Sequence, residues 1–315
     1  MNSIGVDVGG TKIAAALVNS DGTSERTVEV PSTPDDTDHM LESIVEAIEQ
    51  LEVAESLPVG VAVAGYLDRP RSMVRFSPNI DAWRNVPLRA NLEARLGRAV
   101  RLENDANAAA YGEWRHGAGR GYEDVLMVTL GTGVGGGVVI GGSVLIGGTG
   151  TGGEVGHITV EPGGRLCGCG LRGCLEAYSS GTALAKSGRK ALEDKVAGHE
   201  ALAERCSGDA AALESPEIVE LAQNGDLLSQ ELVGDVGRWL GRGIATMSAI
   251  LDPQRIVVGG GLAEVGDLVL GPAREMYAQI QERGHRPTVT VALAELGNDA
   301  GVIGAAALAA AEAGR

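Results

Sequence analysis

The stretch IGVDVGGTKIAAALV, residues 4–18, predicts a buried strand, a tight turn and a returning strand. Two glycines in the turn let backbone N–H groups approach an anion closely, and a hydroxyl and a positive charge accompany them. The turn consists of Gly9, Gly10, Thr11 and Lys12. Asp7, at the end of the first strand, could hold Mg²⁺ on phosphate oxygens. The turn lacks the spacing of a P-loop, so the alternative interpretation is an ordinary hairpin.

A second stretch, LMVTLGTGVGGGVVI at residues 126–140, repeats the pattern of strand, glycine- and threonine-rich turn, and strand. Its turn contains Gly131, Thr132 and Gly133. We interpret the two stretches as a weak internal duplication, in which each of two related halves presents a phosphate loop. A later predicted strand is followed by Gly259, Gly260 and Gly261, which allow close approach of a flat ligand. Pro272 is expected to open a helix.

A strand predicted at residues 99–103 is followed by Asn104 and Asp105, which open a helix. The Asp105 carboxylate is therefore expected where a strand ends and a helix begins. One interpretation is a helix cap, a role in which Asn and Asp are common. The other is a general base next to a ligand-binding amide, both held on a rigid junction.

A turn after another predicted strand carries a second candidate amide. Gly65 closes the strand, and Asn79 follows Ser77 and Pro78 in the turn. The Asn79 side chain either meets a ligand hydroxyl or simply forms the turn, and the sequence alone favours neither interpretation.

Three of the four cysteines lie in the stretch GGEVGHITVEPGGRLCGCGLRGCLE, residues 152–176. Three thiolates and an imidazole can complete a closed tetrahedral zinc site of the structural kind. The candidate ligands are His157, Cys167, Cys169 and Cys174. A zinc ion here would also fix Glu154 and Glu176, one at each end of the stretch. The alternative is a set of buried or redox-active cysteines.

The composition excludes several classes of protein. The chain has 315 residues, of which 44% are hydrophobic, so it is expected to be globular. A net charge of −16 argues against nucleic-acid binding. No apolar run approaches the roughly 20 residues of a membrane span. The N-terminus leads straight into a predicted strand, so we expect no secretion signal and a cytoplasmic location, where cysteines more often bind metal than form disulfides.

The charged residues are unusual in kind. The 42 acidic residues outnumber the 26 basic ones, and the only lysines are Lys12, Lys186, Lys190 and Lys195. An acidic, lysine-poor surface stays hydrated in concentrated salt, where its self-repulsion is screened. A halophilic source explains this composition, and so does a GC-rich genome that favours Arg over Lys.

Taken together, the motifs resemble those of sugar kinases of the ROK family (repressors, open reading frames, kinases), and within it those of glucokinases. The matching motifs are DVGGTK at 7–12, ENDANAAAYGE at 103–113, LGTGVGGG at 130–137, GEVGH at 153–157, CGCGLRGCLE at 167–176 and GGGL at 259–262. The similarity covers the full length in family order, and the histidine and cysteine-triplet signature is highly specific. Gly152-Gly153-Glu154 departs slightly from the family's usual sequence.

The resemblance implies an α/β fold of the actin-like ATPase type, a duplicated ribonuclease H-like fold with two domains and a cleft between them. The small domain would comprise residues 1–112 plus 299–315. The large domain, residues 113–298, would carry the zinc motif and the adenosine site. A homodimer or homotetramer is also implied.

The resemblance further implies ATP-dependent phosphorylation of the 6-hydroxyl of glucose, a glycolytic reaction, with Asp105 as general base. Residues implied to bind the sugar are Gly65, Asn79, Asn104, Asp105, Glu154, His157 and Glu176. Those implied to hold the phosphates are Gly9, Gly10, Thr11, Lys12, Gly131, Thr132 and Gly133. Asp7 would act through Mg²⁺, and Gly259, Gly260 and Gly261 would take the adenosine. The zinc would be structural, with one nitrogen of His157 on the metal and the other on the sugar.

Alternatives stay open within and outside this class. The acceptor could be fructose, mannose, N-acetylglucosamine or N-acetylmannosamine, and the donor could be polyphosphate. A sugar-sensing regulator is the non-enzyme alternative. Family repressors carry an N-terminal helix-turn-helix, for which a first strand near residue 4 leaves no room.

Overall fold

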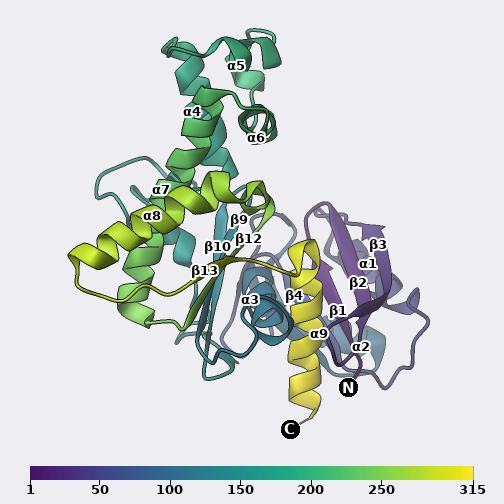
Figure 1. The fold of residues 1–315 in the computed structure, drawn as a ribbon. Coiled ribbons are helices and arrows are strands. Elements are labelled where there is room, and N and C mark those ends of the chain that lie inside the picture. Colours follow the sequence, from purple (N-terminus) through teal and green to yellow (C-terminus); the bar gives the residue numbers. More distant parts are fainter. Residues whose placement is uncertain (315) are drawn as a thin grey trace. The chain divides into compact units, whose positions relative to one another are not determined.

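The structure is a computed structural model that describes residues 1–314, and the chain forms two compact units (Figure 1). Unit 1 comprises residues 1–126, residues 137–153 and the C-terminal segment from Ala294. Unit 2 comprises residues 127–136 and 154–293.

Unit 1 is built on a five-stranded sheet with the strand order β3-β2-β1-β4-β8. The strands are β1 (Ser3–Val8), β2 (Lys12–Val18), β3 (Ser24–Pro31), β4 (Val59–Val63) and β8 (Val100–Asn104). The first three strands pair antiparallel, whereas β4 lies parallel to both β1 and β8. Because β4 and β8 end on the same edge of the sheet as β1, the segments that follow all three strands start at that edge.

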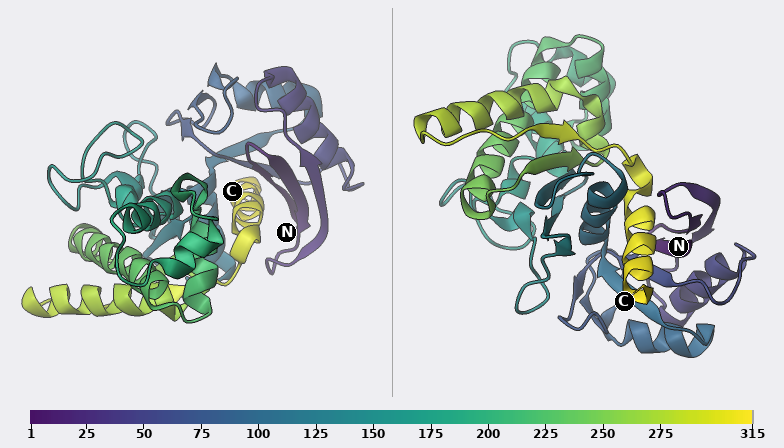
Figure 2. Two further views of the ribbon diagram at one scale, coloured as in Figure 1. Left: turned by 90° about the horizontal axis from the view of Figure 1, so that it is seen from above. Right: turned by 60° about the horizontal axis from the view of Figure 1, so that its bottom comes forward.

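Both faces of this sheet are covered, which explains why β1 reads as a nearly continuous apolar run. The helices of unit 1 are α1 (Thr37–Glu49), α2 (Leu88–Leu96), α3 (Asp105–His116) and α9 (Ala300–Ala313). Ile4 and Val6 of β1 share one core with Met40 and Ile44 of α1. On the other side, Val302 of α9 packs with residues of β2. Figure 2 shows α9 running along this sheet.

Glycines set the distance between α9 and its neighbours. A Cβ atom at Gly5 of β1 would lie 1.9 Å from the carbonyl oxygen of Val302. One at Gly60 of β4 would lie 1.9 Å from the carbonyl oxygen of Ala305. These backbones therefore pack at a separation that no larger residue allows.

A small three-stranded sheet in unit 1 has the order β5-β6-β7. Its strands are β5 (Tyr66–Leu67), β6 (Val74–Phe76) and β7 (Arg84–Val86). The turn between β5 and β6 contains Arg71, which is fully buried. This sheet follows directly after Gly65, so it places the candidate turn residue Asn79 on the same unit as the junction of β8 and α3.

A second five-stranded sheet has the order β11-β10-β9-β12-β13. Its strands are β9 (Val125–Leu130), β10 (Val134–Ile140), β11 (Ser143–Val144), β12 (Arg255–Gly259) and β13 (Val291–Leu293). The two sheets have the same order, with β11, β10 and β9 in the places of β3, β2 and β1. In each sheet two later strands that are parallel to each other complete the order, β12 and β13 in the places of β4 and β8. This repetition confirms the predicted duplication and the α/β fold of actin-like ATPases.

The helices of unit 2 are α4 (Gly181–Glu193), α5 (Glu200–Arg205), α6 (Ser215–Gln223), α7 (Leu227–Leu251) and α8 (Asp267–Arg283). The short 3₁₀ segments of the chain are η1 (Val155–His157), η2 (Leu175–Ala177), η3 (Ala210–Ala212), η4 (Gly261–Val265) and η5 (Gly297–Asp299). The prediction that Pro272 opens a helix is wrong, because α8 begins at Asp267 and contains Pro272. The amides of Val269 and Leu270 already bond to the Gly266 carbonyl, so the first turn forms ahead of the proline and the helix loses only one later bond.

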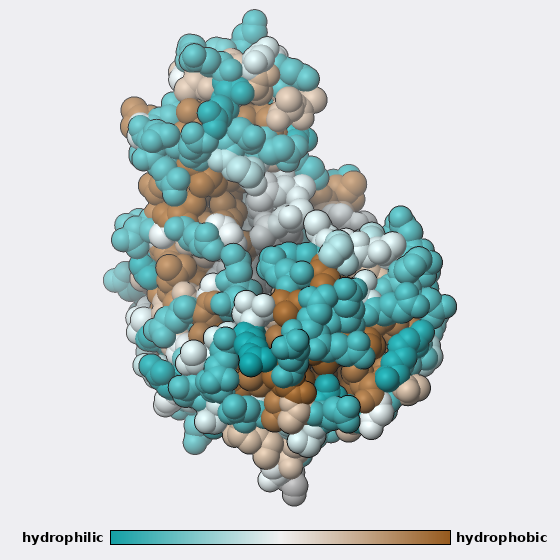
Figure 3. Space-filling view, turned by 90° about the vertical axis from the view of Figure 1, so that its right-hand side faces the viewer, coloured by the Kyte–Doolittle hydropathy of each residue, from teal (hydrophilic) through white to brown (hydrophobic). Residues whose placement is uncertain are grey.

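The surface agrees with the composition. Hydrophilic residues cover most of the face shown in Figure 3, and hydrophobic residues appear there in smaller patches. Among the described residues, no helix combines the length and the apolar character needed to cross a bilayer.

Candidate active site

The junction of β8 and α3 settles which residue caps the helix. The Oδ1 atom of Asn104 accepts a hydrogen bond from the backbone N–H of Asn107 at 3.1 Å, so Asn104 is the cap. The Nδ2 atom of Asn104 donates to the Gly65 carbonyl at 3.2 Å and to Asp105 Oδ1 at 2.8 Å. Asn104 thereby ties Gly65 to Asp105, and the carboxylate of Asp105 is not spent on capping.

Asp105 is held from one side only. The backbone N–H of Ala106 also donates to Asp105 Oδ1, at 2.8 Å. The hydrogen bonds from Asn104 and from Ala106 both go to Oδ1, which leaves Oδ2 as the oxygen available to a ligand hydroxyl. Burial raises the pKa of Asp105, while the hydrogen bonds from Ala106 and Asn104 lower it. A carboxylate with a raised pKa that is fixed on a rigid junction has the properties of a general base.

A second partly buried carboxyl group, that of Asp7 at the end of β1, belongs to the same unit. Burial, and then the negative charge of Asp105, raise the pKa of Asp7 to about 7, against a smaller lowering by Lys12. A Cβ atom at Gly301 would lie 2.9 Å from Asp7 Oδ2, so the first turn of α9 lies against this carboxyl group. Two nearby carboxyl groups favour a bound cation, and Mg²⁺ prefers oxygen ligands of this kind.

Because its pKa is raised, the ionised form of Asp7 lowers the free energy of unfolding of the ligand-free protein at neutral and higher pH. In the unfolded chain the pKa of Asp7 returns to 3.8, so the folded state binds the proton more tightly than the unfolded state does. The free energy of unfolding therefore falls as the pH rises from about 4 to about 7. We expect Asp7→Asn to raise the free energy of unfolding at pH 8 by about 1–3 kcal/mol, since the side chain keeps some solvent contact. At pH 5 the wild-type carboxyl group is already largely protonated, so the difference should shrink.

Thermal unfolding of wild type and Asp7→Asn at both pH values, without ligands, measures this effect. A variant that is equally destabilised at pH 5 and pH 8 would show that Asp7 is not held as a buried, poorly solvated carboxyl group.

The first glycine turn is closed by a backbone hydrogen bond and lies next to Asn79, one of the predicted sugar-binding residues. The Gly9 N–H donates to the Lys12 carbonyl at 3.0 Å. A Cβ atom at Gly10 would lie 2.4 Å from the Asn79 carbonyl oxygen, so the turn and Asn79 are in direct contact. The Lys12 ammonium forms an ion pair with Glu29 on β3, and both side chains are exposed. A phosphate would therefore compete with Glu29 for Lys12.

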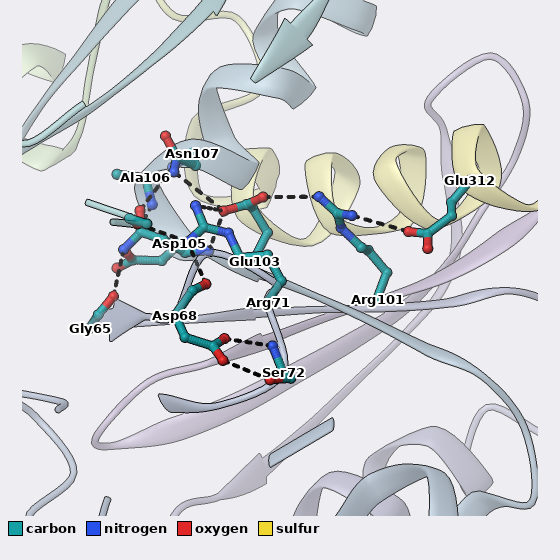
Figure 4. A network of polar contacts seen from close by, with 12 residues as sticks. Gly65, Asp68, Arg71, Ser72, Arg101, Glu103, Asp105, Ala106, Asn107 and Glu312 are labelled. Carbon is teal, nitrogen blue, oxygen red and sulfur yellow. Dashed lines mark hydrogen bonds and ion pairs between the residues drawn. The ribbon is translucent and has the colours of Figure 1, made fainter. Parts of the chain in front are cut away.

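A buried ion pair lies beside the junction of β8 and α3 (Figure 4). Arg71 Nη2 lies 2.6 Å from Glu103 Oε1, and both side chains are only 1% exposed. Glu103 Oε1 also accepts from the Asn104 N–H at 3.0 Å and from Asn107 Nδ2 at 3.3 Å. Arg71 Nη1 donates to the Gly150 carbonyl at 2.8 Å. One ion pair thus joins the β5–β6 turn, the loop around Gly150 and the residues that flank Asp105.

The second glycine loop, in unit 2, is hydrogen-bonded to Glu176, one of the residues predicted to bind the sugar. The Gly131 N–H donates to the Gly133 carbonyl at 3.0 Å, which closes the loop. Glu176 Oε2 accepts from the Val134 N–H at 3.1 Å. A Cβ atom at Gly133 would lie 2.4 Å from that oxygen, so a larger residue there would make the Glu176 side chain shift. Glu176 therefore holds the loop in position through its side chain.

The four candidate metal ligands come together in unit 2. One ligand atom from each of His157, Cys167, Cys169 and Cys174 lies within 4.8 Å of the others. Cys169 Sγ and Cys174 Sγ are 3.7 Å apart, and Cys167 Sγ is 3.8 Å from His157 Nδ1. Zinc–sulfur bonds of about 2.3 Å in a tetrahedron put sulfurs about 3.8 Å apart, so the donor set fits zinc.

The surroundings of the cysteines also favour a cation. Burial raises the pKa of Cys167 and of Cys174, so a nearby cation is needed to hold both as thiolates at neutral pH. Cys167 Sγ also contacts Glu176 Oε1 at 3.3 Å, which connects the cysteine cluster to the glycine loop. Glu154, which is predicted to bind the sugar, is exposed and directly precedes η1. Gly156 of η1 packs against the Val134 carbonyl.

The last glycine run packs on the end of β9. Gly260 has φ 87°, and a Cβ atom there would lie 2.5 Å from the Leu130 carbonyl oxygen. A Cβ atom at Gly261 would meet open space. Gly260 is thus needed for the fold, and Gly261 is the position at which a flat ligand could approach the backbone.

Within unit 1 the structure brings together the predicted residues Asp7, Gly10, Gly65, Asn79, Asn104 and Asp105. Within unit 2 it brings together Gly131, Gly133, His157, Glu176 and the three clustered cysteines. Sequence reasoning missed Arg71, Glu103 and Gly301. Glu103 stands beside Asn104 in the sequence, but only the fold shows that its charge is buried and paired.

Comparison with known proteins gives a consistent result. The family model described as "ROK family" matches residues 3–312. A glucokinase of Streptomyces coelicolor is 43% identical over 98% of this chain and 97% of its own length. An N-acetylmannosamine kinase of Escherichia coli is 35% identical over 98% of both chains. The crystal structure of a ROK family glucokinase from Streptomyces griseus, in complex with glucose and AMPPNP, superimposes with a TM-score of 0.85 at 41% identity, covering 99% of this chain and 100% of that one.

Proposed function

Because this chain belongs to the ROK family, we infer that it is an ATP-dependent glucokinase, which transfers the terminal phosphoryl group of ATP to the 6-hydroxyl of glucose. The observation that carries this inference is the partly buried Asp105 carboxylate on its rigid junction, in a chain 41% identical to a structure containing glucose and AMPPNP. Phosphoryl transfer depends mainly on positioning and on neutralisation of charge, and the site offers groups for both.

We assign the base role to Asp105. As the sugar oxygen bonds to phosphorus and the bond from phosphorus to the leaving phosphate oxygen breaks, the hydroxyl proton passes to Asp105 Oδ2. Asn104 and Ala106 hold Oδ1, so the carboxylate keeps one orientation throughout. The raised pKa of Asp105 makes it a better proton acceptor than an exposed aspartate.

We assign the phosphates to the two glycine turns and the metal to Asp7. Gly9, Gly10, Thr11 and Lys12 would serve in unit 1, and Gly131, Thr132 and Gly133 in unit 2. Asp7 would hold Mg²⁺, whose charge would offset the burial and the repulsion by Asp105 that together raise the Asp7 pKa. The adenosine would lie at Gly259, Gly260 and Gly261, of which Gly261 is open to solvent.

We propose that the residues whose side chains bond to hydroxyls of the sugar are Asn79, Asn104, Glu154, His157 and Glu176, with the Gly65 backbone in support. Both amide protons of Asn104 are already used within the chain, so its remaining capacity is a second lone pair on Oδ1. Its main contribution would then be to orient Asp105.

We propose that His157, Cys167, Cys169 and Cys174 hold a structural zinc ion. The distances and the paired thiols support this donor set. When bound, zinc would fix the loop that carries Glu176 and would set which nitrogen of His157 stays free for a hydroxyl.

We expect the purified protein to contain about one zinc ion per chain, because a closed four-ligand site binds zinc tightly. Elemental analysis of wild type, Cys169→Ser and Cys206→Ser measures this. Cys206 donates to the Leu202 carbonyl away from the cluster and is the matched control. Zinc should fall in Cys169→Ser only, together with the melting temperature. A zinc-free wild-type protein of unchanged stability would contradict the proposal.

The function is tested by the rate of phosphorylation of glucose, mannose, fructose and the two N-acetylhexosamines with ATP. We expect glucose to give the highest kcat/KM. A preference for N-acetylmannosamine would favour the alternative suggested by the relative of that activity. Binding of glucose without turnover of any sugar would favour a sugar-sensing regulator.

A further inference from the structure

The carboxylate of Glu103 lies near the end of β8, directly before the two residues that form the junction with α3. Its side chain is 1% exposed, and Figure 4 shows it between the guanidinium groups of Arg71 and Arg101. Arg71 Nη2 lies 2.6 Å from Oε1, and Arg101 Nη2 lies 3.3 Å from Oε2. These residues, and all others discussed below, belong to unit 1.

The Oε1 atom of Glu103 also accepts two hydrogen bonds from the start of α3. The backbone N–H of Asn104 donates to it at 3.0 Å, and Asn107 Nδ2 donates to it at 3.3 Å. In a capping box, the N–H of the cap residue bonds to a glutamate or glutamine side chain three residues later. Here Asn107 stands at that later position, and Glu103, just before the cap, supplies the oxygen instead. Glu103 therefore fixes the backbone of Asn104, whose side chain in turn holds Asp105.

A gain in stability does not explain this buried ion pair. Removing two charges from water is costly, and apolar residues of similar size often stabilise a protein as well or better. The backbone of Arg71 adds a further cost, because its φ of 54° lies in the left-handed region that a non-glycine residue rarely adopts. Strained conformations of this kind concentrate at functional sites, so the pair points to a role in the geometry of the neighbouring junction.

Backbone oxygens hold Arg71 on its other side. Its Nη1 atom donates to the Gly150 carbonyl at 2.8 Å and to the Asp68 carbonyl at 3.4 Å. A Cβ atom at Gly150 would lie 2.6 Å from the Leu67 carbonyl oxygen, so this loop packs directly on the β5–β6 turn. Two backbone segments thus determine where the guanidinium lies, and the guanidinium determines where Oε1 of Glu103 lies.

We propose that Glu103 is a positioning residue for phosphoryl transfer, which acts through Asn104 to hold the Asp105 carboxylate in its reactive orientation. The proposal rests on the kinase function inferred above. Its essential feature is the oxygen that accepts from the Asn104 N–H, and Arg71 keeps that oxygen in place. Without it, the Asn104 N–H and the buried Asn107 amide would lose their acceptor, so the first turn of α3 would shift toward other partners. A displacement of about 1 Å can cost on the order of 10²-fold in rate.

The test compares two double variants that differ only at residue 103. Arg71→Met/Glu103→Gln, the glutamine variant, removes both charges and keeps a side-chain oxygen for the Asn104 N–H. Arg71→Met/Glu103→Met, the methionine variant, removes the same charges and that oxygen as well. Glu312→Gln is the control, because Glu312 pairs with Arg101 at the solvent end of the network and its side chain is 56% exposed. Its kcat should equal that of wild type.

Kinetics with glucose and ATP and chemical denaturation are measured for every variant. The titration of Asp105 is followed in the ligand-free protein through the ¹³C NMR signal of its carboxyl group, assigned with Asp105→Asn. We expect kcat of the methionine variant to lie roughly ten- to hundredfold below that of the glutamine variant, with a smaller change in KM for glucose. A loss of stability common to both variants does not produce this difference.

The pKa of Asp105 should be higher in the methionine variant, because the hydrogen bond from Asn104 that lowers it would be weakened. The acid limb of kcat/KM should then lie at higher pH than in the glutamine variant. Both variants retain Asp7 and lack the charges of residues 71 and 103, so a change of charge does not cause the shift.

Equal kcat in the two double variants, or the same Asp105 titration in both, overturns the proposal. If the methionine variant does not fold, Glu103→Asp takes its place, because it keeps the charge and draws the oxygens back by one methylene group. Its kcat should be lower than that of wild type and its Asp105 pKa higher, and unaltered values overturn the proposal. If wild type phosphorylates no sugar, the kinase assignment fails, while the titration of Asp105 still judges whether Glu103 positions it.

Discussion

Asp105→Asn is expected to keep its fold and its affinity for glucose while losing kcat by about 10²–10⁴-fold. The amide retains the shape of the carboxyl group and can still accept hydrogen bonds from Asn104 and Ala106 on one oxygen. It cannot take the proton from the sugar hydroxyl, so the oxygen is not activated as it bonds to phosphorus. Loss of the charge that acts on Asp7 also removes repulsion, so the folded state should not be weakened.

Steady-state kinetics, glucose binding and thermal unfolding of the variant separate these effects. Asp35→Asn, at an exposed position of the same unit, removes the same charge and should leave kcat unchanged. In wild type, kcat/KM should fall as pH drops through the raised pKa of Asp105, because the protonated carboxyl group cannot act as a base. An Asp105→Asn variant that retains a tenth of wild-type kcat would exclude Asp105 as the base.

Gly304→Ala is expected to lower the free energy of unfolding by about 3–5 kcal/mol, or to prevent folding. Gly304 lies in α9, and a Cβ atom there would lie 1.7 Å from the Ala108 carbonyl oxygen of α3. The obstacle is the backbone of a helix, which cannot rotate away as a side chain can. The contact is reciprocal, since a Cβ atom at Gly112 of α3 would lie 2.7 Å from the Ala300 carbonyl oxygen.

Gly234→Ala in α7 is the matched control. A Cβ atom there would lie 3.4 Å from the flexible end of Arg238 and 3.7 Å from Pro272, which are ordinary contacts. Alanine should therefore be neutral or stabilise the helix by up to about 1 kcal/mol. Chemical denaturation measures both variants. A Gly304→Ala protein as stable as wild type would show that α3 and α9 do not pack as closely as described.

A displacement of α9 would also reach the active site. Asp105 is the first residue of α3, and Gly301 of α9 lies against Asp7. We therefore expect any soluble Gly304→Ala protein to lose activity together with stability, whereas Asp105→Asn loses activity alone.

The sequence by itself determined the local elements and the chemical groups of the site. The pattern of strand, glycine turn and strand was predicted at residues 4–18 and again at 126–140. Such predictions succeed because apolar runs and paired glycines determine the backbone conformation of the few residues around them. The four metal-ligand candidates could be read for the same reason, since three of them fall within eight residues of one another. The junction of Asn104 and Asp105 was also predicted, but the sequence left open which of the two capped the helix.

Only the tertiary structure decided the contacts between residues far apart in the chain. The Ser3 hydroxyl donates to the Ala306 carbonyl at 2.8 Å, which joins opposite ends of the sequence, and no periodicity reports such a contact. The ion pair of Arg71 and Glu103 is buried because three separate segments close over it. The pKa of Asp7 is raised by burial and by Asp105, and both causes exist only in the folded chain. Patterns along a chain report local geometry, whereas desolvation and charge coupling depend on which distant segments pack together.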